Sequence, residues 1–267
     1  MDISDLRIHH GAKFDLDAID TRAPDGVTKE ETAPKTAALI EQLVQHQEMM
    51  WAGNAHRLLI VLQATDTGGK DGTIRRVIGP LNSQGVRIAS FKAPTPLELA
   101  HDFLWRVHSQ APGNGEIVVF NRSHYEDVLI ARVHDLVPEP QWRARYDHIR
   151  NFERLISDEG TTVVKFYLHI SRGEQKQRLQ SRLDEPEKHW KFNIADIAER
   201  AKWDDYRTAF EDAITETDAD HAPWYVIPAD QKWYRDFLVA SVLEYTIKQL
   251  EMSWPAPVED LSKILIN

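Results

Sequence analysis

Short, unbroken runs of hydrophobic residues alternate along this chain with longer stretches in which apolar positions recur every three to four residues. The clearest run lies within residues 57–63. An apolar run of that length is typical of a strand buried on both faces. Similar runs predict strands at residues 86–91, 116–120, 162–170 and 224–227. The recurring pattern predicts helices at residues 34–53, from 70 onward, and at 95–108, 124–133, 141–159, 171–183, 194–215 and 230–251.

This alternation of strands and helices predicts a three-layer α/β fold with a mainly parallel, five-stranded sheet. Ligands of such sheets bind beyond the carboxyl ends of the strands, so we expect functional residues just after each strand. Residues 1–32 lack periodicity and predict an irregular N-terminal arm. One domain is expected at residues 33–251, with a lid at about 172–193, and a C-terminal tail at 252–267.

Composition narrows the class of protein. The 267 residues include no cysteine, which excludes a disulfide scaffold and cysteine-ligated metal sites. There is no targeting signal or long apolar segment, so we expect a cytoplasmic protein without a membrane span. The net charge of −10 argues against a general nucleic-acid-binding protein. Residues 57–92, however, hold six basic and two acidic side chains, which predicts a basic track inside an acidic molecule.

The segment after the first strand resembles a phosphate-binding Walker A loop. Gly69 and Lys70 match the motif at the expected distance from the strand, whereas its first glycine is alanine and its Ser/Thr position is Asp71. Backbone N–H groups at a helix N-terminus, with a lysine beside them, form an anion site. Asp66 suits such a loop if it holds a metal ion or orients a phosphate oxygen. An ordinary glycine-rich turn is the structural alternative.

A second group of polar residues, 121–127, follows the third strand. Asn121 takes the place of the usual metal-binding carboxylate, and Arg122 is well placed for a phosphate group. Glu126 and Asp127 are candidate metal ligands, although acidic residues also favour the first turn of any helix. His124 is expected to be structural.

A third group belongs to the predicted lid. Arg178 and Arg182 are spaced to share one helix face, and in nucleotide kinases such arginines close over the transferred phosphate. A solvated basic face is the alternative. Trp190 and Phe192 in the lid turn are candidates for stacking on adenine. The tryptophans of the predicted helices are expected in the core: Trp51, Trp105, Trp142, Trp203 and Trp233.

Taken together, these motifs resemble the type 2 polyphosphate kinases over about residues 30–250. The matching segments are Asp66-x-x-Gly69–Lys70–Asp71–Gly72, Phe120-x-Arg122–Ser123-x-Tyr125, Glu174–Gln175-x-x-Arg178-x-x-x-Arg182, Trp190–Lys191–Phe192, Trp203-x-x-Tyr206, Ala222–Pro223–Trp224 and Ile227–Pro228–Ala229. The version with Asn121 is similar to the subgroup that accepts both AMP and ADP.

The resemblance implies a P-loop kinase-like fold and Mg²⁺-dependent (or Mn²⁺-dependent) phosphoryl transfer between inorganic polyphosphate and adenine nucleotides, without a phosphohistidine. It implies a homo-oligomer. The implied catalytic residues are Asp66, Lys70, Arg122, Arg178 and Arg182, and the implied metal ligands are Asp66 and Asp127. The implied substrate-binding residues are Thr67, Gly68, Gly69, Asp71, Arg75, Arg76, Lys92, Asn121, Glu126 and Lys191.

Two other functions compete with this interpretation. An ATP-dependent nucleoside or nucleotide kinase would use the same fold with another phosphate donor. A non-catalytic module that binds polyanions or nucleotides would retain a degenerate phosphate loop. Basic residues that extend away from the loop (Arg75, Arg76, Arg87 and Lys92) favour a long phosphate chain as the donor, and the retained carboxylates favour catalysis.

Overall fold

The computed structural model describes residues 3–8 and 14–266 and confirms the predicted α/β fold. Its described residues form one sheet of five parallel strands in the order β2-β3-β1-β4-β5. The strands are β1 (Arg57–Gln63), β2 (Val86–Ser90), β3 (Ile117–Asn121), β4 (Thr161–His169) and β5 (Trp224–Pro228). The central strand, β1, is almost entirely buried, which is why its sequence is continuously apolar.

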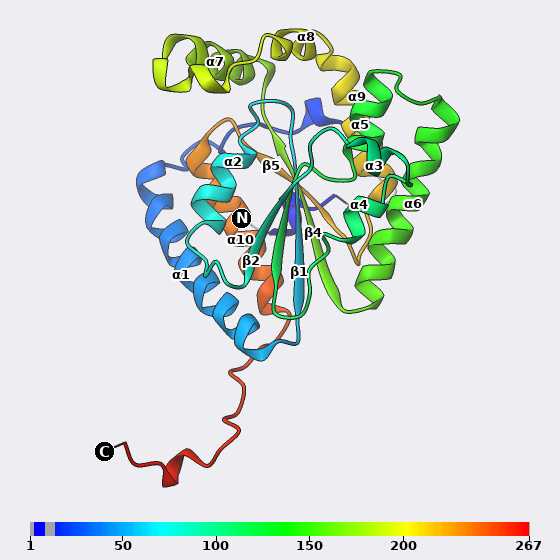
Figure 1. Ribbon diagram of the computed structural model, residues 1–267. Helices are drawn as coiled ribbons and strands as arrows, with labels where there is room; N and C mark the ends of the chain where they lie inside the picture. The colour runs from blue at the N-terminus through cyan, green and yellow to red at the C-terminus, as the bar shows by residue number, and fades with distance from the viewer. Residues whose placement is uncertain (1–2, 9–13, 267) are drawn as a thin grey trace.

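Helices cover both faces of the sheet (Figure 1). One face packs against α1 (Lys29–Gly53), α2 (Lys70–Thr73) and α10 (Lys232–Lys248), and the other against α5 (Glu126–Val133), α6 (Glu139–Asp158) and α9 (Trp203–Thr217). Along β1, Leu58, Ile60 and Leu62 enter the first core, whereas Leu59 and Val61 enter the second. This is the alternation that a strand imposes on successive side chains.

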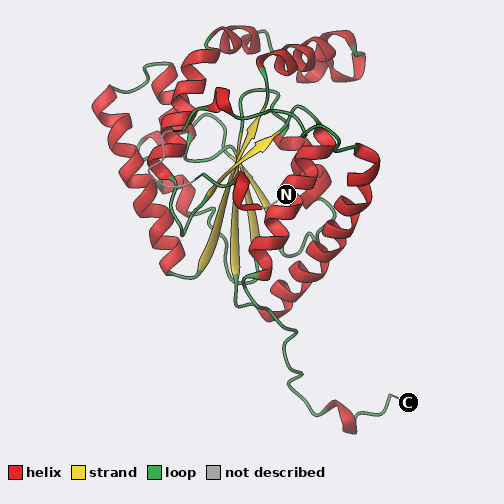
Figure 2. Cartoon of the chain, turned by 180° about the vertical axis from the view of Figure 1, so that it is seen from behind, coloured by secondary structure: helices red, strands yellow, loops and turns green. Residues whose placement is uncertain are grey.

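The remaining helices are short or lie at the carboxyl end of the sheet. Helices α7 (Arg172–Asp184) and α8 (Ala195–Ala201) stand above the strand ends, as both views show (Figures 1 and 2). The others are α3 (Pro96–Leu99), α4 (Trp105–His108), a π-helical turn at Ile74–Ile78, and 3₁₀ turns at Ile3–Leu6, Leu16–Ala18, Pro186–Lys191 and Leu261–Lys263.

Three predicted helices differ from the structure. Helix α1 begins at Lys29 rather than at residue 34, because the Thr28 hydroxyl caps the N–H of Glu31 at 3.3 Å. The predicted helix at 95–108 is two short helices, since the Asp102 carboxylate accepts the N–H of Leu104 and forms a turn between them. The predicted helix at 194–215 is broken at Lys202, whose ammonium donates to the carbonyl of Val133.

Two of the predicted core tryptophans are not in the core. Trp51 and Trp105 are 42% and 44% exposed, and the ring of Trp105 stacks on His101. Trp142 is buried as predicted, whereas Trp203 and Trp233 are partly buried against the core. Spacing alone did not separate these cases, because a helix end leaves the core while its apolar pattern continues.

The two ends of the chain behave differently. The described N-terminal residues include a backbone bridge from Arg7 to Tyr225 of β5, so part of the arm adds to the sheet edge. The tail after α10 extends away from the sheet (Figure 1). No helix in the described ranges has the length and apolar character needed to cross a membrane. The division into arm, domain, lid and tail stays a prediction.

Candidate active site

The loop between β1 and α2 has the geometry of an anion site. Gly69 has φ +109°, a conformation that glycine adopts without strain. A Cβ on Gly68 would lie 2.4 Å from the Cβ of Ala64, so the tight turn also requires glycine there. Within the described part of the chain, the hydroxyls of Thr65, Thr67 and Thr73 are buried without a hydrogen-bond partner. Of these three residues, Thr65 and Thr67 also line a cavity, where a polar ligand could supply the missing partner, whereas Thr73 does not.

Lys70 begins α2, and its ammonium donates to the carbonyl of Ala64 at 3.0 Å. Burial lowers the pKa of Lys70, and the nearby charge of Arg122 lowers it further, against the opposing effect of Glu126 and Asp66. The lysine therefore stands in a confined place where a bound phosphate would supply the missing negative charge.

Arg122 connects the phosphate loop to the third strand. It has φ +61° immediately after β3, and its guanidinium binds the Asp66 carboxylate at 3.1 Å and the Glu126 carboxylate at 3.3 Å. Burial alone would lower the pKa of Arg122, but Glu126 and Asp66 more than offset it, so the pKa is raised. Beside this group, the amide of Asn121 donates to Asp71 at 2.8 Å. Residues some 50 positions apart thus meet at one edge of the sheet.

Asp127 lies between two arginines that the sequence did not single out. Its carboxylate oxygens are 3.7 Å from Arg145 Nη1 and 3.9 Å from Arg106 Nη2. Burial raises the pKa of Asp127, which the two arginines only partly oppose. The predicted role of Asp127 as a metal ligand stays a prediction, and a cation there would compete with both guanidiniums.

The lid contacts the phosphate loop directly. Arg178 donates to the carbonyl of Thr67 at 2.9 Å and to the carbonyl of Ala229 at 2.6 Å, and its Nε binds Glu174. Gln175 donates to the carbonyl of Asp66 at 3.2 Å. In this arrangement Arg178 braces the lid against the loop, and most of its N–H groups already have protein partners.

Arg182, one helical turn further, binds the Asp196 carboxylate at 2.9 Å and the carbonyl of Lys191 at 3.0 Å. The Trp190 side chain is 79% exposed and lies under the Lys191 ammonium. The site has a large cleft and a smaller pocket, which are described below. Among the described residues that line them, neither Trp190 nor Phe192 forms part of the wall. Their predicted stacking on adenine is therefore not supported by their positions.

One cleft of about 1580 Å³ gathers every predicted site residue. Its wall includes the whole phosphate loop, Arg75, Arg76, Lys92, Asn121, Arg122, Glu126, Asp127, Arg178, Arg182 and Lys191. Arg57 and Arg87 are the exceptions among the six basic residues of the predicted basic track. Arg87 lies near the start of β2, opposite Val118, and donates to Gln110 at 2.8 Å, outside the cleft wall. Arg87 was therefore wrongly included, because only the carboxyl end of a strand faces the cleft.

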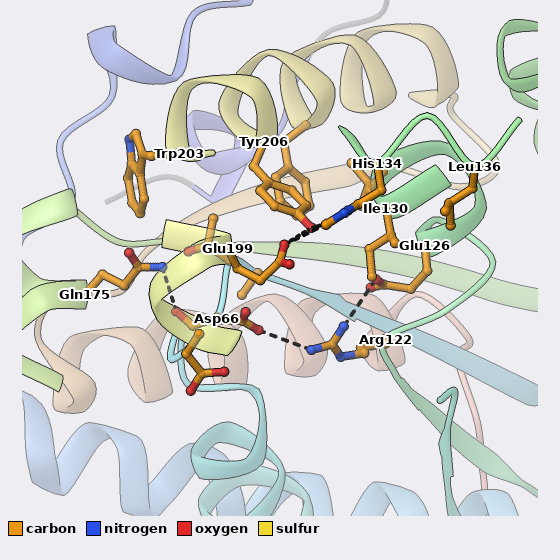
Figure 3. A pocket seen from close by; sticks show the side chains of 15 residues that line it. Asp66, Arg122, Glu126, Ile130, His134, Leu136, Gln175, Glu199, Trp203 and Tyr206 are labelled. Atoms are coloured by element: carbon orange, nitrogen blue, oxygen red, sulfur yellow. Dashed lines mark hydrogen bonds and ion pairs between the residues drawn. The ribbon is translucent and has the colours of Figure 1, made fainter. Parts of the chain in front are cut away.

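A second pocket of about 460 Å³ opens beside the cleft and shares Asp66, Arg122 and Glu126 with it (Figure 3). The apolar and aromatic part of its wall consists of Leu129, Ile130, Leu136, Trp203, Tyr206 and Phe210. Tyr206 and His134 both bind the Glu199 carboxylate, at 2.6 and 2.9 Å, as the dashed lines show. The pocket suits a flat apolar group that carries polar edges.

The sequence analysis missed several residues of these cavities. Trp203 was assigned to the core, although it stands in the pocket wall with Tyr206, and the matching Trp203-x-x-Tyr206 segment was an available signal. Arg106, Arg145, Lys188, Lys232 and Arg235 add positive charge to the cleft. They come from four different elements, and no local pattern marks them.

The residues fit a hard divalent cation only if a phosphate ligand completes its shell. The described part of the chain contains no group of three or more His, Cys, Asp or Glu side chains that could hold a metal ion. Mg²⁺ typically keeps several waters and binds one or two carboxylates together with substrate phosphates. Asp66 and Glu126 meet at Arg122 and provide such oxygens beside the loop hydroxyls.

Comparison with known proteins agrees with this geometry. A family model described as polyphosphate kinase 2 matches residues 26–254. An AMP/ADP-polyphosphate phosphotransferase of Meiothermus ruber is 52% identical over 264 residues, which cover 98% of each chain. An ADP-polyphosphate phosphotransferase of Rhodopseudomonas palustris is 43% identical over 98% of this chain and 95% of its own.

Solved structures give the same result. Polyphosphate kinase 2 from Arthrobacter aurescens TC1 has a TM-score of 0.92 and 43% identity to this chain, and the match covers 97% of this chain and 93% of the other. The shared fold, the family model and the high identity over the full length of relatives all agree. The chain belongs to the polyphosphate kinase 2 family.

Proposed function

We propose that this protein transfers phosphoryl groups between inorganic polyphosphate and adenine nucleotides. It would convert AMP into ADP and ADP into ATP, and both reactions would be reversible. One observation carries the proposal: a single cleft joins the phosphate loop, Arg122 and the lid arginines to an aromatic pocket. Relatives over the whole chain are named for AMP/ADP-polyphosphate and ADP-polyphosphate phosphotransfer.

The nucleotide would bind with its base in the smaller pocket, between Trp203, Tyr206 and Ile130. Its phosphate would then reach the part of the wall that both cavities share, at Asp66 and Arg122. Polyphosphate would follow the larger cleft, whose wall carries Arg75, Arg76, Lys92 and Lys191 in addition to the loop. A linear polyanion needs a longer positively charged surface than a nucleotide does.

In the reaction, an oxygen of the nucleotide phosphate attacks the terminal phosphorus of polyphosphate, and the bond from that phosphorus to the bridging oxygen breaks. Lys70, Arg122, Arg178 and Arg182 would stabilise the charge on the transferred group. Because the attacking oxygen is already anionic, no strong general base is required. Arg178 would have to exchange some of its contacts with backbone carbonyls for contacts with phosphate oxygens.

Transfer would be direct. His134 stands in the pocket wall, but its Nε2 binds Glu199 and its Nδ1 faces the Lys202 ammonium at 3.1 Å. His124 is fully buried against Glu153. Both arrangements favour structural imidazoles over a phosphorylated intermediate.

Mg²⁺, or Mn²⁺ in its place, would neutralise phosphate charge when bound. Asp66 is well placed to hold the ion because it lines both cavities. Glu126 shares the same arginine, and Asp127 stays the second predicted ligand. A homo-oligomer in the cytoplasm is the remaining expectation, which analytical ultracentrifugation and cell fractionation would test.

One assay separates this function from the two alternatives. The purified protein would receive Mg²⁺, long-chain polyphosphate and AMP without ATP, and the nucleotides would be resolved by chromatography. We expect ADP and ATP. A protein that makes ADP only from ATP plus AMP is an ATP-dependent kinase, and no turnover with either donor indicates a binding module.

Two variants complete the assay. Lys70→Ala should lower the rate of product formation by about 10²–10³-fold if the loop is the reaction centre. Lys176→Ala is the matched control, because Lys176 is an exposed lysine of the lid helix and lies outside both cavity walls.

A further inference from the structure

Arg235 lies behind the phosphate loop and is almost completely buried. It is in the first turn of α10, and its side chain is 1% exposed. A Cβ on Gly69 would lie 2.0 Å from Arg235 Nη1, and a Cβ on Gly72 would lie 3.2 Å from Arg235 Nη2. The guanidinium therefore fills the space that side chains at these two positions would need.

One carboxylate holds this guanidinium in place. Asp236 Oδ1 accepts hydrogen bonds from Arg235 Nε at 2.9 Å and from Nη2 at 2.6 Å. The other oxygen of Asp236 accepts from Arg76 Nη1 at 3.1 Å, and Arg76 stands in the cleft wall. Such a fork-like geometry fixes the orientation of a guanidinium plane.

The charges in this group do not cancel. Two guanidiniums share the single carboxylate of Asp236, so the trio keeps a net positive charge behind the loop. A third guanidinium, that of Arg178, lies nearby with Nη1 3.5 Å from the same Cβ position on Gly69, although its charge is paired with Glu174. Burial lowers the pKa of Arg235, an effect that Asp236 opposes and that Arg178 and Arg76 reinforce. A guanidinium nonetheless remains charged in proteins.

We propose that Arg235, oriented by Asp236, is a positioning residue that holds the Gly69–Gly72 turn and keeps a fixed positive charge behind the bound phosphate. The ligand class is a linear condensed phosphate, and the inference rests on the proposed function. Arg235 borders the cleft behind the loop, but its side chain is only 1% exposed, so it acts through the loop rather than by direct contact. The proposal also explains the glycines at 69 and 72, which leave room for the guanidinium.

The test is the binding of inorganic tripolyphosphate, measured by calorimetry at low and high salt, together with thermal unfolding. We expect Arg235→Met to weaken binding about 10- to 100-fold, the scale of one charge several ångströms away in a medium of intermediate dielectric. The KM for AMP should change little. Arg235→Lys should recover part of the affinity, because the ammonium keeps the charge but cannot form the fork. Lys176→Met, an exposed lysine of α7 outside both cavity walls, is the matched control.

A second variant separates positioning from stability. Gly72→Ala would place a methyl group 3.2 Å from Arg235 Nη2, so the guanidinium would have to shift by a few tenths of an ångström, while alanine favours the helix in which it lies. We expect weaker tripolyphosphate binding without a lower melting temperature. If Arg235→Met does not fold, Arg235→Lys and Gly72→Ala decide the matter.

Three outcomes are distinct. Variants of Arg235 and Gly72 that bind tripolyphosphate within about twofold of the parent overturn this inference, even where their melting temperatures fall. Weakened binding in these variants, with no product from polyphosphate and AMP in the parent protein, overturns the proposed function alone. Weakened binding in an active parent protein supports both.

Discussion

The most informative stability test is the replacement of Lys165 by methionine. Lys165 lies in β4 with its side chain fully buried, and its ammonium donates to Glu153 at 2.6 Å, to the carbonyl of Thr217 at 2.8 Å and to the Tyr125 hydroxyl at 3.0 Å. Glu153 in turn accepts from Tyr125 and contacts His124. This network anchors Tyr125, the N-cap of α5, three residues after Arg122.

The expected loss follows from burial. Lys165→Met leaves the Glu153 carboxylate, which is 1% exposed, without its ammonium partner. Removal of one partner of a buried ion pair costs about 3–5 kcal/mol, a large fraction of the roughly 5–15 kcal/mol by which domains are stable. For a chain of this size the melting temperature should fall by about 6–20 °C.

The pH dependence provides an independent check. Burial alone would raise the pKa of Glu153, but Lys165 and His124 outweigh it and hold that pKa below its ordinary value. A lowered carboxyl pKa stabilises the fold above the ordinary value of about 4.3, and this stability is lost as the pH falls through the lowered value. The part of the difference between parent and Lys165→Met that comes from this lowered pKa should therefore stay constant from pH 7 down to about 4.3 and shrink only below that pH.

Urea unfolding at several pH values measures both effects. Lys176→Met, an exposed lysine of α7, is the control and should stay within about 0.5 kcal/mol of the parent. The double variant Glu153→Gln/Lys165→Met should recover part of the loss, because no unpaired charge remains. A Lys165→Met protein within about 1 kcal/mol of the parent at pH 7 would refute the reasoning.

Three further predictions concern catalysis. Lys70→Ala should lower kcat by about 10²–10³-fold; steady-state kinetics with polyphosphate measure this, and a loss below tenfold contradicts the role. Burial and Arg122 lower the pKa of Lys70, so kcat/KM should begin to fall at a pH below the ordinary lysine value of about 10.4. Lys70→Arg should remove this alkaline limb of the pH profile. A limb that is unchanged in Lys70→Arg would belong to another group. Trp203→Ala should raise the KM for AMP about tenfold through lost stacking and leave the KM for polyphosphate unchanged; the reverse pattern would place the base elsewhere.

Much of the fold could be predicted because its signals are local. The run at residues 57–63 is apolar since β1 is central and covered on both faces, and the glycine-rich turn after it follows from the conformation of Gly69. Element ends were less accurate. Thr28 caps α1 ahead of Pro34, and Lys202 interrupts an otherwise continuous helical pattern through a contact with α5.

The candidate site could be predicted only where its residues follow strands. Asp66, Lys70 and Arg122 stand at the carboxyl ends of β1 and β3, and any parallel sheet brings such residues together. Arg87 was misplaced because proximity in sequence to the loop says nothing about which end of β2 it occupies. Trp203 was taken for a core residue because the wall of a pocket is as apolar as a core.

The sequence by itself determined the parallel sheet, the phosphate loop and the order of the motifs, since each depends on neighbours within a few residues. Only the tertiary structure decided which distant side chains complete the site. Arg235 reaches Gly69 from 166 residues further along the chain, and Tyr206 and Glu126 line the same pocket. These contacts arise from how whole helices pack on the sheet. The hydrophobic pattern around each of these residues does not reveal which distant residue it will contact.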